Sequence, residues 1–310
     1  MLVLTVLGTL LIVLTYLLRE AAGSTRLARA RLDRERAYAL TAAAIERALQ
    51  RLADDDDLLT DHLREPWAQP ERLETPDGDL IETVIEDEQR RFDLNNLAVI
   101  PGTHPMLPPS DLVADLLRFC GDSDPHPRVV ALKDWIDADV DGPYEREFYT
   151  QANLPSRPPN APLLSPEEIV FVYGFPSNWW HRGGAEGASD HCPPGRMMTV
   201  LPGPHTHPVP VNLNTAPEEL LLVLFGPGQR QLVNLVCTLR DTAPLRSLEP
   251  LVAVAEPVRA LRLWAYVDVR SEWFSVHSTA TTPRVRVRAH ALVHRTNDGV
   301  VKVVRWDRGP

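Results

Sequence analysis

Acidic side chains gather at one point of this sequence. Asp137, Asp139 and Asp141 alternate and are followed by Gly142. This D-x-D-x-D-G spacing is the opening of a calcium-binding loop, in which alternate carboxylates turn toward one ion. So many carboxylates on one turn repel each other unless a cation neutralises them. The pattern predicts a calcium site, and the alternative is an acidic loop exposed to solvent.

The loop is not a complete EF-hand. An EF-hand needs a bidentate glutamate at its twelfth position, and that position is Phe148. Two glutamates lie close by, off that register. The predicted calcium ligands are Asp137, Asp139, Asp141, Glu145 and Glu147.

Histidines form a second group, within residues 181–208, a stretch rich in glycine, proline and histidine. His205-Thr-His207 could ligate zinc, but no acidic or thiol partner sits at a useful spacing. We predict a mobile polar loop here. No G-x-S-x-G, P-loop, H-E-x-x-H or G-x-G-x-x-G motif occurs, so the sequence does not predict an enzyme. The group consists of His181, His191, His205, His207 and Cys192.

The composition restricts the class of protein. The 310 residues carry a net charge of −10 with a pI near 5.5, which argues against a nucleic-acid partner, because such a partner would need a basic face. A hydrophobic fraction of 44% is typical of a folded chain. Cys120, Cys192 and Cys237 fit no CxxC spacing, and both one disulfide with a free thiol and three thiols stay open.

The first residues predict a membrane anchor. Met1–Leu18 contains no charged residue. About 18 residues at 1.5 Å each make a helix of roughly 27 Å, just enough to cross a ~30 Å hydrocarbon core. The run has neither the basic start nor the cleavage site of an ordinary secretory signal.

The helical pattern continues from Leu27 to Leu52, with Gly23 as a flexible point between the two halves. We expect one long helix, ending where the four carboxylates of Asp54–Asp57 begin a solvated loop. Its predicted buried face consists of Tyr38, Ala42, Ile45, Leu49 and Leu52.

Two separated segments alternate with period two, as strands do. Residues 81–86 place Ile81, Thr83 and Ile85 on one face, and residues 273–306 follow the same rule before and after an Asn297-Asp-Gly299 turn. Each strand set is too small to stand alone, since a lone hairpin is only marginally stable. We therefore predict that both segments join one antiparallel sheet, packed on the long helix.

The intervening region is predicted to be helical with proline-rich connections. Helices are expected near 110–117 (capped by Ser110 or Asp111), at 129–136, and after each of the starts Ser165-Pro-Glu-Glu168 and Thr215-Ala-Pro-Glu-Glu219. Paired asparagines at 95–96 and at 212 and 214 suit structural corners.

The predicted class is thus α+β, with a large α-helical domain inserted between the strands of a helix-plus-sheet module. The expected divisions are a transmembrane helix at 1–18, a stalk helix with first strands at 19–100, the insertion at 101–268 and the last strands at 269–310.

Several segments together resemble the type II secretion system protein K family, the large minor pseudopilins. Besides the apolar start, they are Arg91-Phe-Asp-Leu-Asn-Asn-Leu97, Asp134-Trp-Ile-Asp-Ala-Asp139, Pro159-Asn-Ala-Pro-Leu163 and Val211-Asn-Leu-Asn-Thr-Ala-Pro217. The resemblance covers nearly the whole chain. It implies a pilin-like helix and sheet with a helical insertion that binds calcium.

The resemblance also implies a place in the cell. A member of this family would sit in the inner membrane with its soluble domain in the periplasm, in a tip complex with other minor pseudopilins and above the major pseudopilin. Ordinary pilin-like subunits have a glutamate at residue five, thought to pair with the N-terminal amine of the subunit ahead, and Thr5 cannot supply that charge.

The sequence departs from the family in two places. No basic leader ending in glycine precedes Met1, so we expect the recorded start to lie near the mature one. Leu224-Phe-Gly-Pro-Gly-Gln229 only loosely matches the family's turn. Two other function classes stay open: a membrane-tethered calcium-dependent binding domain unrelated to secretion, and a membrane-anchored hydrolase that uses the histidine-rich segment.

Overall fold

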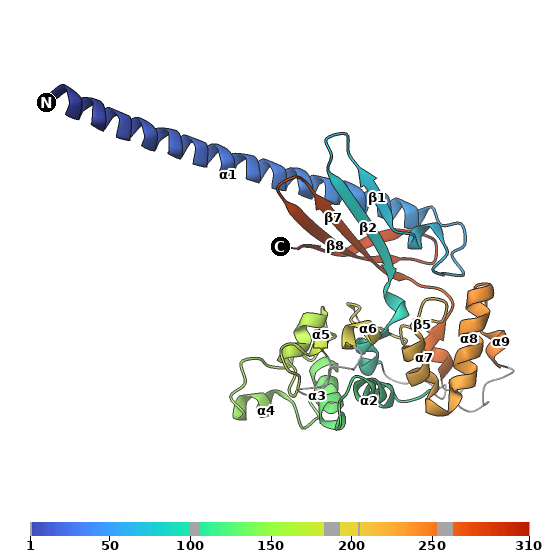
Figure 1. The fold of residues 1–310 in the computed structure, drawn as a ribbon. Coiled ribbons are helices and arrows are strands. Elements are labelled where there is room, and N and C mark those ends of the chain that lie inside the picture. Colours follow the sequence, from blue (N-terminus) through green and yellow to red (C-terminus); the bar gives the residue numbers. More distant parts are fainter. Residues whose placement is uncertain (1, 100–105, 183–192, 204, 253–262, 310) are drawn as a thin grey trace.

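The computed structural model describes residues 2–99, 106–182, 193–203, 205–252 and 263–309, apart from the side chains of Leu4, Thr5 and Pro227. Figure 1 shows three layers: the long helix α1 (Leu2–Ala53), a sheet beneath it, and a helical module on the far side of the sheet. The predicted α+β architecture is confirmed.

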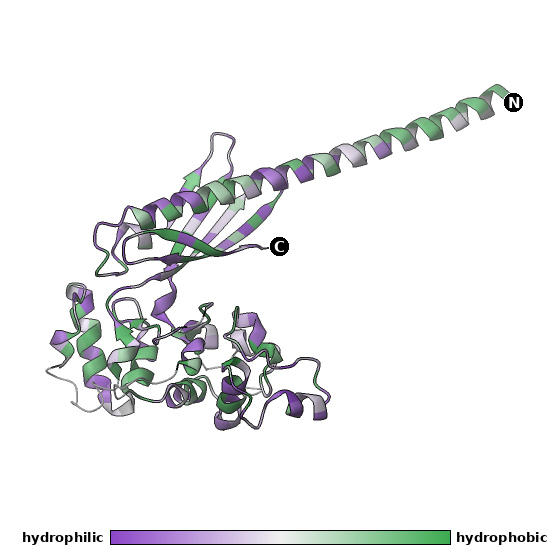
Figure 2. Ribbon diagram, turned by 180° about the vertical axis from the view of Figure 1, so that it is seen from behind, coloured by the Kyte–Doolittle hydropathy of each residue, from purple (hydrophilic) through white to green (hydrophobic). Residues whose placement is uncertain are grey.

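Helix α1 is continuous through Gly23, so the expected flexible point is not a break in the helix. Its first part, through Leu18, has no charged residue and projects away from the body (Figure 2). This segment is long and apolar enough to cross a membrane, and no residue of its most apolar window is buried by the protein. An exposed apolar surface of this extent needs a membrane or partner helices to cover it.

The second half of α1 packs on the sheet through a face that differs from the predicted one. Ile45 and Leu52 are buried as expected, but Tyr38, Ala42 and Leu49 are only half-buried. Small residues take their place and let the helix lie close to the strands. The buried face consists of Ala37, Thr41, Ala44, Ile45, Ala48 and Leu52.

The sheet joins the two predicted strand segments. Its order is β1-β2-β7-β8-β9, and every neighbouring pair is antiparallel. The long-range pairing is that of β2 with β7, in which Ile85 lies opposite Val276. The strands are β1 (Glu71–Glu74), β2 (Leu80–Asp87), β7 (Trp273–Thr281), β8 (Arg286–Arg295) and β9 (Val301–Arg308).

Alternation along the strands places one set of side chains against α1. Ile85, Val276 and Ala291 share a buried cluster with Ile45 and Leu52 of the helix. Trp67 closes the end of this cluster, with its ring 5.1 Å from that of Phe274. The predicted alternation of both segments is confirmed.

The helical module contains short helices and two pairs of very short parallel strands. The α-helices are α2 (Pro109–Phe119), α3 (His126–Ile136), α4 (Arg146–Gln151), α5 (Trp179–Arg182), α6 (Pro194–Met197), α7 (Glu218–Phe225), α8 (Arg230–Thr242) and α9 (Glu249–Val252). The strand pairs are β3 (Phe92–Asp93) with β4 (Met198–Thr199), and β5 (Val211–Asn212) with β6 (Val267–Asp268).

Several local predictions need correction. The sequence of residues 91–97 also predicts a second extended segment after 81–86, but a 3-10 helix, Leu94–Ala98, follows β3. Helix α2 begins at Pro109 and has no side-chain cap, because the capping position is Pro108, whose side chain has no hydrogen-bond acceptor. Ser165 precedes a 3-10 helix, Pro166–Phe171, rather than an α-helix.

The predicted mobile loop at 181–208 is wrong for its described middle part. Residues 194–199 form α6 and β4, and Met198 and Leu201 are fully buried. The free energy gained by burying the apolar side chains in this stretch stabilises the fold. It outweighs the tendency of the surrounding glycines and prolines to form a loop. His191 and Cys192 lie outside the described residues.

The module has its own apolar core, which includes Phe92 and Leu94 upstream and Val269 downstream of the predicted insertion. Pro101 itself lies outside the described residues. The core therefore extends past both expected ends of the insertion, and the division at 101 and 268 stays a prediction.

Buried polar groups join the module to the sheet. Arg295 at the end of β8 is ion-paired with Asp55 and Asp61, and all three side chains are almost inaccessible to solvent. The predicted solvated run Asp54–Asp57 is therefore wrong for Asp55. A buried guanidinium needs anionic partners, and the chain after α1 supplies them.

A second set of hydrogen bonds continues this junction. The Asp87 carboxylate accepts from the hydroxyls of Ser271 and Thr215 and from the Asn212 amide, at 2.7, 2.5 and 3.2 Å. Asn214 exchanges two bonds with the backbone of Leu245. The structural role predicted for these asparagines is confirmed.

Candidate metal centre

Three of the five predicted ligands converge where α3 ends. One oxygen each of Asp137, Asp139 and Glu145 lies within 4.8 Å of the other two. The helix positions Asp137 as its C-terminal capping residue, and Glu145 precedes α4. Asp139 lies between them on an exposed turn.

The electrostatics of this cluster favour a cation. Burial, with the charges of Asp139 and Asp134 adding to it, raises the pKa of Asp137 to about 6. Asp137 Oδ1 and Glu145 Oε1 are buried and accept no hydrogen bond from any residue that the structure describes. Unpaired buried carboxylate oxygens destabilise a fold unless a cation or water satisfies them. An all-oxygen donor set of this kind fits calcium.

Asp134 supports the loop from beneath. Its Oδ2 accepts a hydrogen bond from the backbone N–H of Tyr144 at 2.8 Å, which fixes the return of the chain toward Glu145. Burial raises the pKa of Asp134 as well. Gly142 passes so close that a Cβ there would lie 2.3 Å from the same carboxylate oxygen.

Asn160 closes the site from a distant part of the sequence. Its side-chain amide donates to the backbone carbonyl of Asp139 and, at 3.2 Å, to Glu145 Oε2. Asn160 adopts a positive φ of 51°, a conformation that asparagine tolerates better than most residues. It holds the ligand turn and α4 together.

The two remaining predicted ligands do not converge on the cluster. Asp141 is exposed, and its backbone N–H donates to Asp139 Oδ1 at 2.9 Å. Glu147 is exposed in the first turn of α4. The D-x-D-x-D-G spacing alone could not exclude Asp141 as a calcium ligand. The direction of the Asp141 side chain depends on how the turn folds back on Asp134.

Sequence reasoning did not select Asp134 or Asn160 as site residues. Both lie inside segments that carried the family resemblance, 134–139 and 159–163. Because both segments belong to the same family resemblance, they could have been expected to contact each other in the fold.

Replacing Gly142 by alanine tests the close approach to Asp134. The added methyl group pushes the turn away from the carboxylate and weakens its bond to Tyr144, so we expect about 1–3 kcal/mol of destabilisation in urea unfolding. If the loop binds calcium, stabilisation by calcium should fall as well. Gly228→Ala is the matched control, because a Cβ at Gly228 meets no atom within 4 Å. Equal effects of the two substitutions would contradict this role.

A second acidic group, Asp55, Asp61 and Glu65, has oxygens equally close together. Arg295 already supplies its positive charge. Glu65 Oε2 accepts from the His62 backbone and the Trp67 indole, at 2.8 and 2.7 Å. The group is therefore satisfied by the protein itself and is a weaker candidate for a metal.

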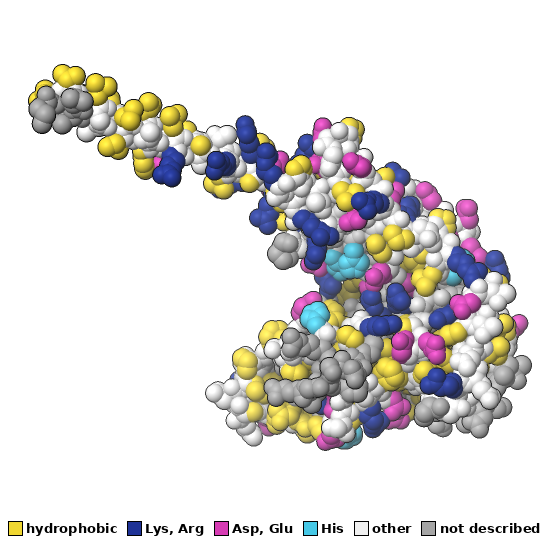
Figure 3. Space-filling view, viewed as in Figure 1, with side chains coloured by type: hydrophobic (Ala, Val, Ile, Leu, Met, Phe, Trp, Pro, Cys, Tyr) yellow, Lys and Arg dark blue, Asp and Glu magenta, His cyan; other side chains and the backbone are white. Residues whose placement is uncertain are grey.

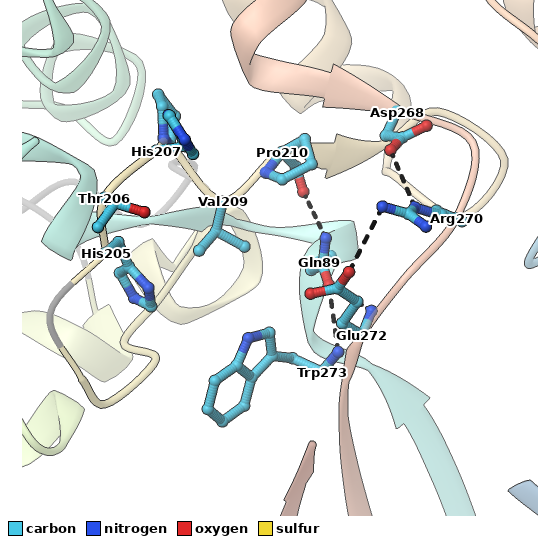
Figure 4. A pocket seen from close by; sticks show the side chains of 11 residues that line it. Gln89, His205, Thr206, His207, Val209, Pro210, Asp268, Arg270, Glu272 and Trp273 are labelled. Carbon is cyan, nitrogen blue, oxygen red and sulfur yellow. Dashed lines mark hydrogen bonds and ion pairs between the residues drawn. The ribbon is translucent and has the colours of Figure 1, made fainter. Parts of the chain in front are cut away.

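The predicted histidine-rich segment contributes to a different pocket (Figure 4). His205 and His207 line a cavity of about 370 Å³ with Gln89 and Arg270. His205 Nε2 lies 3.2 Å from the carboxylate of Asp93. Burial lowers the pKa of His205, but its bond to buried Asp93 outweighs this and the net shift is upward.

These contacts give His205 a structural role. Within the part of the chain that the structure describes, neither histidine belongs to a cluster able to share an ion. Gln89 spans the pocket, donating to the carbonyl of Pro210 and accepting from the backbone of Trp273. The pocket is a seam between the sheet and the module rather than a catalytic arrangement.

No family model matches the chain, but it is similar to a curated protein and to a solved structure. The chain is 30% identical over 147 residues to the putative type II secretion system protein K of Escherichia coli strain K12. This stretch is 45% of the present chain and 44% of that protein, so the chain matches less than half of the length of this curated relative.

The fold matches over a much larger part. A chain in the crystal structure of the GspK-GspI-GspJ complex from the enterotoxigenic Escherichia coli type 2 secretion system is similar, with a TM-score of 0.70. The match covers 91% of this chain and 99% of that one, at 21% sequence identity. It confirms the fold class.

Proposed function

We propose that this protein is a minor pseudopilin of a type II secretion system, with a structural role in assembly at the tip of the pseudopilus. The observation that carries the proposal is the fold match over 91% of the chain to a component of the GspK-GspI-GspJ complex. The sequence similarity to a type II secretion protein K supports it independently.

Helix α1 supplies the means of anchoring and assembly. Its apolar first half suits a single membrane span, and we assign it to the inner membrane with the sheet and the module in the periplasm. The same apolar surface can pack on the corresponding helices of neighbouring subunits once the protein leaves the membrane.

The bulk of the helical module favours the tip. The module lies beside the sheet and extends far from the axis of α1 (Figure 1). A block of this size would clash if it were repeated in every layer of a filament. Thr5 brings no carboxylate for a subunit ahead, which suits a position with no subunit ahead.

We also propose that the protein binds calcium between α3 and α4. We assign Asp137, Asp139 and Glu145 as ligands through side-chain oxygens, with Asp134 and Asn160 as the residues that position them. The ion would neutralise the carboxylates and fix the loop between α3 and α4. No step of a chemical reaction is assigned to this site, and the role of the protein is structural.

Co-expression tests the assembly. The full chain, solubilised in mild detergent with the two smaller minor pseudopilins of the same system, should form a complex of one copy of each, measured by native mass spectrometry. A chain that stays monomeric under conditions in which the two smaller proteins associate would contradict the proposal.

A further inference from the structure

Helix α1 is uncovered between its apolar first part and the sheet. The sheet reaches the helix at Asp33, whose carboxylate is ion-paired with Arg284 at 2.8 Å. Before that point residues 19–29, which we call the bare stretch, are all exposed. Figure 3 shows basic side chains along the part of α1 that projects past the sheet. At 1.5 Å per residue, the helix rises about 22 Å from Leu18 to Asp33.

The bare stretch is basic in an acidic protein. It contains three arginines, Arg19, Arg26 and Arg29, and one glutamate, whereas the whole chain has a net charge of −10. Among the described residues, the ion pairs of α1 begin at Asp33, beyond this stretch. Arg26 and Arg29 are neighbours on the helix surface, where like charges repel each other unless an anion faces them.

The arginines lie on the face of α1 that the sheet covers further along. Eighteen residues make five helical turns, so Arg19 is aligned with Ala37. By the same spacing, Arg26 is aligned with Ala44. Both alanines are buried against the strands. Arg29 lies about 60° round the helix from Arg26. The bare stretch therefore continues the face of α1 that packs on protein, with arginines in place of alanines.

Given the function proposed above, on which this inference rests, we propose that the bare stretch binds an acidic surface on the soluble domain of a smaller minor pseudopilin. This domain lies on the sheet side of α1, between the sheet and the membrane. The uncovered length of about 22 Å approaches the ~30 Å diameter of a small domain. Because the rest of the chain is acidic, such a partner is attracted to this stretch and repelled elsewhere.

Lipid headgroups fit the bare stretch less well. The polar layer of a bilayer is roughly 5–8 Å thick on each side of the hydrocarbon core. When the run through Leu18 spans the core and the helix stands upright, Arg26 and Arg29 lie about 12–16 Å beyond its end. Both arginines are then outside the headgroup layer, where a folded domain can reach them.

Binding in a neutral detergent without phospholipid tests the inference. The full chain is titrated into the two smaller minor pseudopilins of the same system, one of them labelled with fluorescein, and anisotropy gives the Kd. Arg26→Glu should raise the Kd about tenfold or more, because a like charge then faces the carboxylates of the partner. Salt should weaken binding of the wild type more than that of the variant, because screening acts on exposed ion pairs.

Arg31→Glu is the matched control. Arg31 is exposed on the same helix, but five residues from Arg26 place it about 140° round the helix axis. The substitution changes the charge equally and should leave the Kd within about twofold of the wild-type value, because an exposed charge outside the interface contributes little. Both variants should keep the unfolding transition of the wild type.

Three outcomes would overturn the inference. Equal effects of the two substitutions, or no effect of either, would remove it and leave the proposed function intact. An effect of Arg26→Glu that appears in phosphatidylglycerol nanodiscs but not in detergent would identify lipid as the ligand instead. A wild-type chain that binds neither smaller protein would overturn the proposed function and this inference with it.

Discussion

We expect calcium to stabilise the wild-type protein but not a variant in which Asp137→Asn is combined with Glu145→Gln. A ligand present at 1,000 times its dissociation constant contributes about 4 kcal/mol when it binds only the folded state. The two substitutions remove charged oxygens from the site where the carboxylates converge. The measurement is the melting temperature with calcium and with a chelator.

The matched control for this experiment is Asp141→Asn combined with Glu147→Gln. It removes the same number of charges from the same segment, but both side chains are exposed and outside the cluster. It should retain the calcium response. Without calcium, the Asp137 and Glu145 variant should equal or exceed the wild type in stability, because it removes repulsion between buried carboxylates. A calcium response lost equally in both double variants would contradict the assigned ligands.

We expect replacement of Arg295 by methionine to destabilise the protein by about 3 kcal/mol or more at pH 8, because removal of one partner leaves buried charges uncompensated. Asp61 is fully buried and Asp55 nearly so. The guanidinium also lies 4.8 Å from the ring of Phe274, so the change removes packing as well. Urea unfolding measures the difference from the wild type.

The pH dependence of this variant has a defined sign. Burial already raises the pKa of Asp61 to about 7, and loss of Arg295 raises it further. When the pKa of a carboxyl group is higher in the folded state than in the unfolded state, the folded state binds more protons above about pH 4. Its contribution to the stability of the fold therefore falls as the pH rises. The destabilisation by Arg295→Met should therefore be larger at pH 8 than at pH 5.

Arg284→Met is the control for this prediction. Arg284 is ion-paired with Asp33 at 2.8 Å, but its side chain is 58% exposed. Exposed pairs contribute about 0–1 kcal/mol. Comparable losses in the two variants, or a loss at Arg295 that does not change with pH, would contradict the role given to the junction.

Helices and strands whose hydrophobic residues recur at a regular spacing were predictable from the sequence. The alternation of Ile81, Thr83 and Ile85 fixes which face of β2 is buried, and this period requires no knowledge of the partner strand. The pairing of β2 with β7 could be inferred because neither strand segment is stable alone. The buried face of α1 was less predictable, since alanines rather than the larger apolar residues approach the strands.

The junction and the site depend on tertiary contacts that no local pattern contains. Asp55 belongs to an acidic run that is typical of a solvated loop, and only its distance from Arg295 in the fold makes it a buried partner. The cluster of acidic side chains was predictable only in part, for a similar reason. Spacing identified Asp137 and Asp139, whereas the exclusion of Asp141 and the role of Asn160 follow from the path of the turn.

The central claim is a place at the tip of a pseudopilus, and immunogold labelling of sheared pseudopili tests it most directly. An epitope in the helical module, introduced at an exposed position such as Arg230, should be labelled at one end of each filament, with about one copy per filament. Labelling along the whole length of the filaments, or its absence from filaments whose assembly depends on this protein, would contradict the claim.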